Sequence, residues 1–347
     1  MKKENLLWIE SLRVLATLGV IFVHVAAGAL RQSGNVTDFV WWVGNIYDSS
    51  VRFCVPIFLM ISGALILSKT YESTGEYLKK RVVRILFPLL FWSLVYIIRD
   101  IYLRFPRGEF TTTMDFVRFA LLRLKNGASF HFWYMYMVIG LYLFFPIIGK
   151  WLSKSNKHEI KYFIGIWLFT VFAQLPFIKD FVPNIELAYF SGYLGLPILG
   201  YYLSRETISD SFKNRVTLIL LTLTGLLITI FGTFLVTKHT GVFYEGFYEF
   251  LSPNVILVSA GLFLLFKNYT KFGPRASSVI LFFSKYSYGI YLGHIFLLRG
   301  VMRTLGFTHS LINPVVGIFI TTILCFIATA LMVWAVNKLP FGKYVSG

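Results

Sequence analysis

The sequence is short of charged residues and of cysteine, and each shortage excludes a class of protein. Only 14% of the 347 residues are charged, whereas a soluble domain carries about a quarter. The two cysteines, Cys54 and Cys325, lie far apart in separate apolar segments, which argues against a disulfide framework or a cysteine-based metal site. The six histidines are scattered without ligand spacing, so we expect no metal centre.

Apolar residues are abundant instead: 56% of the chain is hydrophobic, and phenylalanine alone occurs 36 times. Most of the apolar stretches approach the 20 or so residues that a helix needs to cross a bilayer. We therefore predict an all-α, polytopic membrane bundle, with residues 1–347 forming one integral-membrane domain. The ten expected spans are Ser11–Leu30, Ser50–Leu67, Ile85–Leu103, Phe132–Gly149, Tyr162–Phe177, Tyr189–Leu203, Val216–Val236, Leu251–Phe266, Val279–Leu298 and Ile312–Val336. Glycines and Pro197 predict that Tyr189–Leu203 is broken or tilted.

The net charge of +17 is explained by the membrane, and no nucleic-acid motif accompanies it. Lys and Arg concentrate in loops on the cytoplasmic side of membrane proteins, where they also meet anionic lipid. With ten spans and the N-terminus inside, the internal loops hold more Lys and Arg than the external ones. This distribution places both termini in the cytoplasm.

One basic stretch, residues 104–125, lies outside in this topology. Within it, Met114 to Leu124 has the pattern of an amphipathic helix with Val117 and Leu121 on its apolar side. Two interpretations stay open at this point. The stretch is either a helix lying in the lipid interface or a basic rim that holds a phosphate-bearing acceptor.

The first span carries the strongest chemical signal, because ionisable groups inside a membrane are costly and mark functional sites. Arg13 and His24 are eleven residues apart, so a helix places them on one face, roughly 16 Å apart along its axis. Arg13 then lies near the cytoplasmic end and His24 beyond the middle of the bilayer. The alternatives are a snorkelling arginine and a hydrogen-bonded bundle histidine.

The run from Lys79 to Arg84 opens the third span. Arg81 and Arg84 are three residues apart and share a helix face. Two guanidinium groups at the cytoplasmic boundary suit a phosphate or pyrophosphate. An ordinary cluster of cytoplasmic basic residues is the alternative.

A histidine base normally has an orienting partner, and the sequence offers few acids for His24. Glu10 lies at the inner edge, and Asp48 lies four residues before Arg52, a spacing that also predicts an i,i+4 ion pair. His131 and His294 are alternatives by residue type alone. The partner therefore stays unassigned.

These residues together resemble the membrane-bound acyltransferase family 3. An Arg with a His eleven residues later, followed by Arg-x-x-Arg at the third span, is similar to the family pattern. Three further segments agree with family motifs. They are Val55-Pro56-Ile57-Phe58 through Ser62-Gly63, His131-Phe132-Trp133-Tyr134, and Ser287 through Tyr291-Leu292-Gly293-His294. The resemblance covers nearly the whole chain and is closest to stand-alone O-acetyltransferases of surface glycans, such as that of enterobacterial common antigen.

The resemblance implies a donor and an acceptor. The donor is acetyl-coenzyme A or another acyl-coenzyme A, and the acceptor is a hydroxyl of a glycan or lipid-linked glycan, modified at a bacterial inner (plasma) membrane. The family's functional residues carry over to Arg13, Arg81 and Arg84 for the donor and to His24 for catalysis. Weaker substrate-binding candidates are His131, Trp133, Tyr291 and His294.

Residue chemistry agrees with this assignment. His24 is suited to act as a general base on the acceptor hydroxyl. Direct transfer is favoured, because no Ser or Cys stands recognisably beside a base, while an acyl-histidine stays open. A transporter or flippase of a glycan-lipid intermediate is the alternative function, since it also uses intramembrane Arg and His. A non-catalytic subunit with this fold and the choice between monomer and homo-oligomer also stay open.

Overall fold

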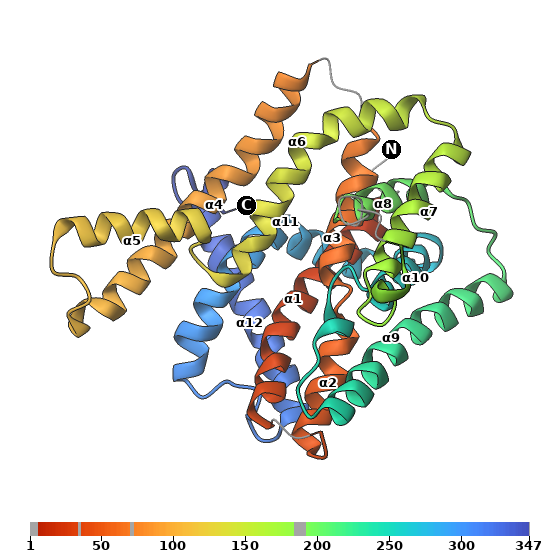
Figure 1. Ribbon diagram of the computed structural model, residues 1–347. Coiled ribbons are helices and arrows are strands. Elements are labelled where there is room, and N and C mark those ends of the chain that lie inside the picture. The colour runs from red at the N-terminus through yellow and green to blue at the C-terminus, as the bar shows by residue number, and fades with distance from the viewer. Residues whose placement is uncertain (1–5, 34–35, 70–72, 184–191, 347) are drawn as a thin grey trace.

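The structure is a computed structural model that describes residues 6–33, 36–69, 73–183 and 192–346. Within these ranges the chain forms helices, turns and loops, and no strand occurs. Figure 1 shows the helices gathered into one bundle, from which α5 and the adjoining part of α4 reach out to one side. The all-α class predicted from the sequence is confirmed.

The described chain forms thirteen α-helices in sequence order. Their bounds are α1 Leu7–Ser33, α2 Phe39–Val51, α3 Cys54–Ser62, α4 Thr74–Arg104, α5 Thr113–Asn126, α6 Trp133–Lys154, α7 Lys157–Ala173, α8 Gly195–Arg205, α9 Phe212–Thr240, α10 Pro253–Tyr269, α11 Pro274–Phe296, α12 Pro314–Lys338 and α13 Gly342–Val345. Two π-helical turns extend α3 and α11, namely η2 (Gly63–Leu67) and η8 (Leu297–Met302). A short 3-10 turn, η4 (Phe130–Phe132), precedes α6.

Seven helical segments in the described part of the chain are long and apolar enough to cross a membrane. They are Leu7–Gln32, Phe39–Leu67, Thr74–Arg107, Phe130–Lys154, Phe212–Thr240, Gly246–Tyr269 and Pro314–Lys338. Each contains one of the ten spans expected from the sequence, except that the last expected span begins two residues earlier, at Ile312 rather than Pro314. The protein is therefore a multi-pass membrane protein, although the expected count of ten is not confirmed.

The three other expected spans are helices of a different kind. Helix α7 has 17 residues and α8 only 11, beginning at Gly195, and residues 189–191 of that expected span lie outside the described residues. Helix α11 is 23 residues long but buries most of its second half inside the bundle, including Ser284 and Ser287, while Lys285 stays exposed. The placement of both termini in the cytoplasm depends on these three segments and stays a prediction.

Large apolar side chains cover the outer face of several helices. On α4, Leu90, Leu94 and Ile98 recur every four residues and are 45–57% exposed. Helices α9 and α12 expose similar rows of Leu, Ile and Phe. Soluble proteins rarely expose apolar surface on this scale, so these faces are the ones that contact lipid.

Helix α5 confirms the amphipathic helix expected at Met114 to Leu124. Its N-terminus is closed by a capping box between Thr112 and Asp115, and hydrogen bonds from the Thr112 and Thr111 backbone hold the pKa of the Asp115 carboxyl at about 2. No residue of α5 is buried, and Val117 and Leu121 are exposed. Apolar exposure beside Arg and Lys is typical of a helix in the lipid interface, and this observation favours the first interpretation.

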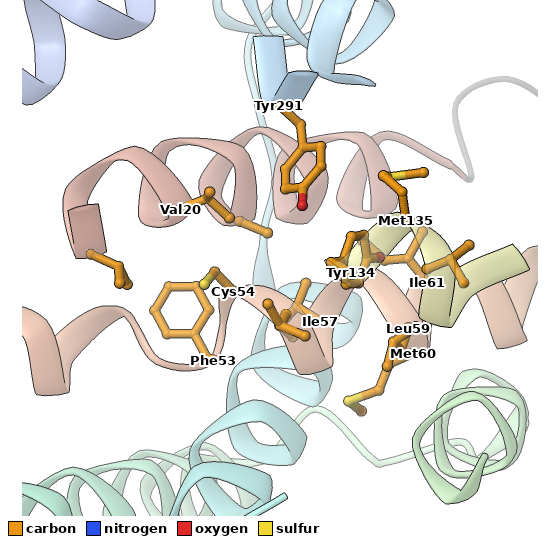
Figure 2. Close-up of a cluster of buried hydrophobic side chains, with 14 of the residues drawn as sticks. Val20, Phe53, Cys54, Ile57, Leu59, Met60, Ile61, Tyr134, Met135 and Tyr291 are labelled. Carbon is orange, nitrogen blue, oxygen red and sulfur yellow. The ribbon is translucent and has the colours of Figure 1, made fainter. Parts of the chain in front are cut away.

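The core lies where α1, α3, α6 and α11 meet. Figure 2 shows Cys54 and Ile57 of α3 lying beneath Val20 of α1, while Tyr291 of α11 points down toward Tyr134 of α6. These side chains belong to one buried apolar cluster. The core therefore surrounds the same helices that carry the predicted site residues.

Two glycines bring helix backbones into direct contact at this core. A Cβ atom at Gly63 would lie 1.8 Å from the carbonyl oxygen of Pro197, and one at Gly200 would lie 2.2 Å from that of Met60. Close approach through small residues is the usual way in which membrane helices pack. Because both neighbours are backbone atoms, no side-chain rotation relieves the clash.

We expect Gly63→Ala to lower the stability of the fold by at least the 1–3 kcal/mol or so that overpacking costs. The matched control is Gly140→Ala, since a Cβ at Gly140 would meet nothing within 4 Å and alanine favours the helix. The measurement is the thermal unfolding midpoint in lipid nanodiscs. Equal midpoints for the two variants would contradict the packing described here.

Candidate active site

A cavity of about 210 Å³ lies among α1, α2, α6 and α11. His24 lines it, near the end of α1 that is remote from Arg13. The cavity is also lined by Val20, Val23, Ala27, Leu30, Arg31, Asp48, Arg52, Cys54, Val55, Phe130, His131, Trp133, Tyr134, Phe243, Glu245, Phe250 and Tyr291. Three of the predicted site residues thus join His24 in one cavity.

Three histidines from distant parts of the sequence meet beside this cavity. The His24 ring is stacked on that of His294, with ring centres 5.3 Å apart and planes 18° apart. His131 lies edge-on to both, its ring centre 4.9 Å from that of His294 and 6.4 Å from that of His24. The structure therefore brings together three histidines whose proximity the sequence left open.

Hydrogen bonds engage both ring nitrogens of His131. Its Nε2 lies 3.3 Å from the carbonyl oxygen of Leu292, and because a carbonyl only accepts, Nε2 carries the proton. Its Nδ1 then accepts from the hydroxyl of Ser129 at 3.0 Å. The hydroxyl of Tyr291 donates to the backbone carbonyl of His131. His131 is thus fully engaged with the protein itself.

His294 and His24 keep ring nitrogens available. Nδ1 of His294 donates to the Tyr291 carbonyl at 2.6 Å, and its buried Nε2 has no partner in the described part of the chain. No hydrogen bond of His24 to any described residue is observed. Of the three imidazoles, only His24 both lines the cavity and has two nitrogens available to a ligand.

Aromatic rings form another wall of the cavity. Trp133 is 41% exposed and stacks on Phe250, with ring centres 5.9 Å apart. Tyr134 and Tyr291 meet at 5.4 Å, in the arrangement visible in Figure 2. Such a wall offers ring faces to an organic ligand beside His24.

The residues predicted from the sequence to bind the acyl donor lie elsewhere, at the end of the bundle where α1 begins. Arg13 forms an ion pair with Glu10 and donates to Ser284 Oγ at 3.1 Å, so its charge is already compensated. Arg81 is partly buried and Arg84 is exposed near the start of α4. None of the three lines the cavity around His24.

Two other cavities lie at this same end. The larger, of about 1130 Å³, is lined by Arg205, Lys267 and Lys271 together with Trp8 and Ser68, and no Asp or Glu is among its described lining residues. The smaller, of about 360 Å³, is lined by Lys69, Lys150, Arg205 and Tyr77.

Tyr77 connects the smaller cavity to the predicted arginines. Arg81 and Arg84 follow Tyr77 by four and seven residues, so all three lie on one face of α4. The Arg-x-x-Arg pair therefore continues the helix face that lines the smaller cavity.

Sequence reasoning missed part of the site around His24. The Asp48–Arg52 ion pair was predicted and is present, but nothing in the sequence indicated that it lines the same cavity as His24. Arg31, Glu245 and Phe250 belong to no motif, and only the fold brings them there. No group of three or more His, Cys, Asp or Glu side chains in the described ranges is arranged to hold a metal ion.

Comparison with known proteins identifies the family. A family model described as an acyltransferase domain matches residues 6–334. The chain is also 22% identical to the "Putative membrane-bound acyltransferase YfiQ" of Bacillus subtilis (strain 168), over 97% of this chain and 92% of that protein. No solved structure matches. The chain belongs to the acyltransferase family 3 that its motifs resemble, and it is an acyltransferase that transfers groups other than aminoacyl groups.

The different hydrogen bonding of the histidines predicts different effects on stability. We expect His131→Ala to lower the unfolding midpoint in nanodiscs, because it leaves the buried Ser129 hydroxyl without its partner, at a cost of about 1–3 kcal/mol. The Leu292 carbonyl keeps its hydrogen bond from Tyr96 Oη. His24→Ala should lower the midpoint less, since it leaves no hydrogen-bonding group of the described residues without a partner. A large loss of stability in His24→Ala would mean that His24 supports the fold.

Proposed function

We propose that this acyltransferase moves an acyl group, most simply acetyl, from acyl-coenzyme A to a hydroxyl of a glycan or lipid-linked glycan at a bacterial plasma membrane, with His24 as general base. The observation that carries the proposal is the His24 imidazole. It lines a cavity within the bundle and has no hydrogen-bond partner among the described residues. In a membrane protein such a group is retained for function rather than for packing.

The reaction needs one base and one thioester. The acceptor oxygen attacks the thioester carbonyl while His24 takes the hydroxyl proton. A new carbon–oxygen bond forms, the carbon–sulfur bond breaks, and the protonated His24 returns its proton to the departing sulfur. Cys54 lines the cavity too, but transfer from the donor to the hydroxyl in one step does not require it.

The cavity sizes support different binding places for the two ends of the acyl donor. Ligand sites generally measure about 300–1,000 Å³. The cavity of about 210 Å³ at His24 has room for the reacting groups but not for a nucleotide. The cation-lined cavity of about 1130 Å³ has room and charge for the nucleotide end of the donor. We therefore place the phosphates among Arg205, Lys267 and Lys271, beside the face that bears Arg81 and Arg84.

The distance between the two ends fits a long donor. Arg13 and His24 lie on one unbroken helix, α1, and eleven residues span roughly 16 Å along its axis. The pantetheine arm of coenzyme A has a length of this order. The thioester would then reach His24 while the phosphates stay at the other end of the bundle.

We expect His24→Ala to reduce thiol release from acetyl-coenzyme A by about 10²–10⁴-fold, the usual contribution of a general base. The matched control is His158→Ala, because His158 is exposed on α7 away from the cavity. Free thiol is followed over time with purified protein in nanodiscs and a crude glycan-lipid extract.

Either contrary result changes the interpretation. Activity retained in His24→Ala would remove His24 from the reaction. Wild-type protein that neither binds the donor nor releases thiol would instead favour a transporter or flippase of a glycan-lipid intermediate, which needs no thioester.

The basic residues that line the cavity of about 1130 Å³ predict a separate effect on the affinity for the acyl donor. Arg205→Gln with Lys271→Gln should raise the donor KM at least tenfold, because each lost charged contact is worth about 1.5–3 kcal/mol. Arg81→Gln with Arg84→Gln should do the same if the helix face of α4 shares the phosphates. An exposed basic pair on α5, Arg118→Gln with Lys125→Gln, is the control. Unchanged donor KM in both test pairs would contradict this placement.

A further inference from the structure

A buried ion pair in the cavity around His24 is not used by the acyl transfer described above. Asp48 and Arg52 lie one turn apart at the end of α2, and their carboxylate and guanidinium groups are in contact. Asp48 is fully buried and the Arg52 side chain is 16% exposed. Both residues line the cavity with His24. A buried charge pair is costly to keep inside a membrane, so its position beside the reactive imidazole calls for a role.

Each member of the pair has one buried polar atom without a partner in the described part of the chain. These atoms are Oδ1 of Asp48 and Nε of Arg52. Most buried polar groups in proteins are hydrogen-bonded. One atom is an acceptor and the other a donor, so together they offer two complementary contacts to a ligand.

The protein fixes the remaining atoms of the pair without help from a ligand. The Arg52 guanidinium lies over the ring of Tyr248 at 4.3 Å, and its Nη1 donates to the Tyr248 carbonyl at 3.4 Å. The Tyr248 hydroxyl in turn donates to Asn45 Oδ1 at 2.6 Å, and the Asn45 amide donates to the Ile230 carbonyl at 3.1 Å. The pair is therefore preorganised.

The charge of the cavity indicates what kind of ligand it holds. Arg31 and Glu245 are exposed and line the cavity, together with the buried pair. Two acids and two bases leave its described lining without net formal charge, in contrast to the cation-lined cavity at the other end. A neutral ligand is favoured here over a phosphorylated one.

We infer that Asp48 and Arg52 bind the acceptor as a neutral polyol, holding two neighbouring oxygens so that a third hydroxyl faces His24. One hydroxyl donates to Oδ1 of Asp48, and the adjacent oxygen accepts from the Nε–H of Arg52. The exposed ring of Trp133 covers an apolar face of the ligand. This assignment rests on the proposed function and restricts its acceptor to molecules with adjacent oxygens, such as sugars.

The test compares two acceptors that share an alkyl chain. Protein in nanodiscs receives acetyl-coenzyme A with either n-octyl β-D-glucoside, below its micellar concentration, or 1-octanol. We expect the glucoside to increase thiol release above the acceptor-free rate and octanol to leave it unchanged. The polyol assignment alone would be overturned if octanol increased thiol release as much as the glucoside. It would also be overturned if neither compound increased thiol release from protein that turns over acetyl-coenzyme A without an acceptor. Absence of any thiol release from wild type would instead overturn the proposed function.

Substitution of the pair gives the second arm. Asp48→Asn keeps the shape and an oxygen for Arg52 but presents a donor where the sugar needs an acceptor. It should raise the KM for the glucoside at least tenfold, with the donor KM and acceptor-free hydrolysis unchanged. Arg52→Lys keeps the charge but removes the Nε–H. If Asp48→Asn does not fold, Arg52→Lys should show the same rise of the glucoside KM without a change of the donor KM or of acceptor-free hydrolysis.

The matched control is Asp100→Asn, which disturbs the ion pairs of Asp100 with Arg99 and Arg123 outside the cavity. It should leave the glucoside KM unchanged. Two results would mean that the Asp48–Arg52 pair only supports the fold. One is a rise of the glucoside KM in Asp100→Asn equal to that in Asp48→Asn. The other is an equal fall in the rates of hydrolysis and of transfer in Asp48→Asn and Arg52→Lys.

Discussion

The structure depends on the cost of an unsatisfied polar group inside a bilayer, where no water is available to pair with it. Most intramembrane hydroxyls meet this constraint locally, as when Thr229 and Ser259 donate to the carbonyl four residues earlier. Around one cavity the constraint is relaxed. Asp48 Oδ1, Arg52 Nε and His294 Nε2 lack partners among the described residues, beside the unbonded imidazole of His24. Buried polar atoms without a partner also occur elsewhere in the described chain, as at Trp92 and Thr322, but here a carboxylate and a guanidinium line the same cavity as His24.

The two ends of the bundle differ in charge, and this difference organises the chemistry between them. Cations without acids line the described cavity where α1 begins, whereas acids and bases balance in the cavity around His24. Helix α1 joins the two ends without a break. In the proposed reaction this difference would direct an anionic donor and a neutral acceptor to opposite ends, and the thioester would need only to reach between them.

The sequence predicted the helical class, seven of its spans and several members of the site, but not the arrangement of that site. Helical periodicity relates Arg13 to His24 because both lie on one helix, whereas no local rule brings His131 and His294 beside His24 from helices far apart in the chain. The count of ten spans was not confirmed, because in the described part of the chain α7 and α8 have only 17 and 11 residues and α11 is not among the helices apolar enough to cross a membrane. Glu245 and Phe250 had no signal, since they precede a helix in a loop without a motif.

His24 differs from the histidine of a hydrolase triad in lacking a carboxylate partner among the described residues; its nearest aligned neighbour is the stacked ring of His294. A carboxylate would stabilise the imidazolium and strengthen the base. A thioester does not need that help, because its leaving thiol has an ordinary pKa of about 8.5 and departs more readily than an alkoxide. In the proposed mechanism a neutral imidazole that takes a proton from the acceptor and returns it to sulfur is then sufficient, and the ion pair formed by Asp48 and Arg52 is left to hold the acceptor in place.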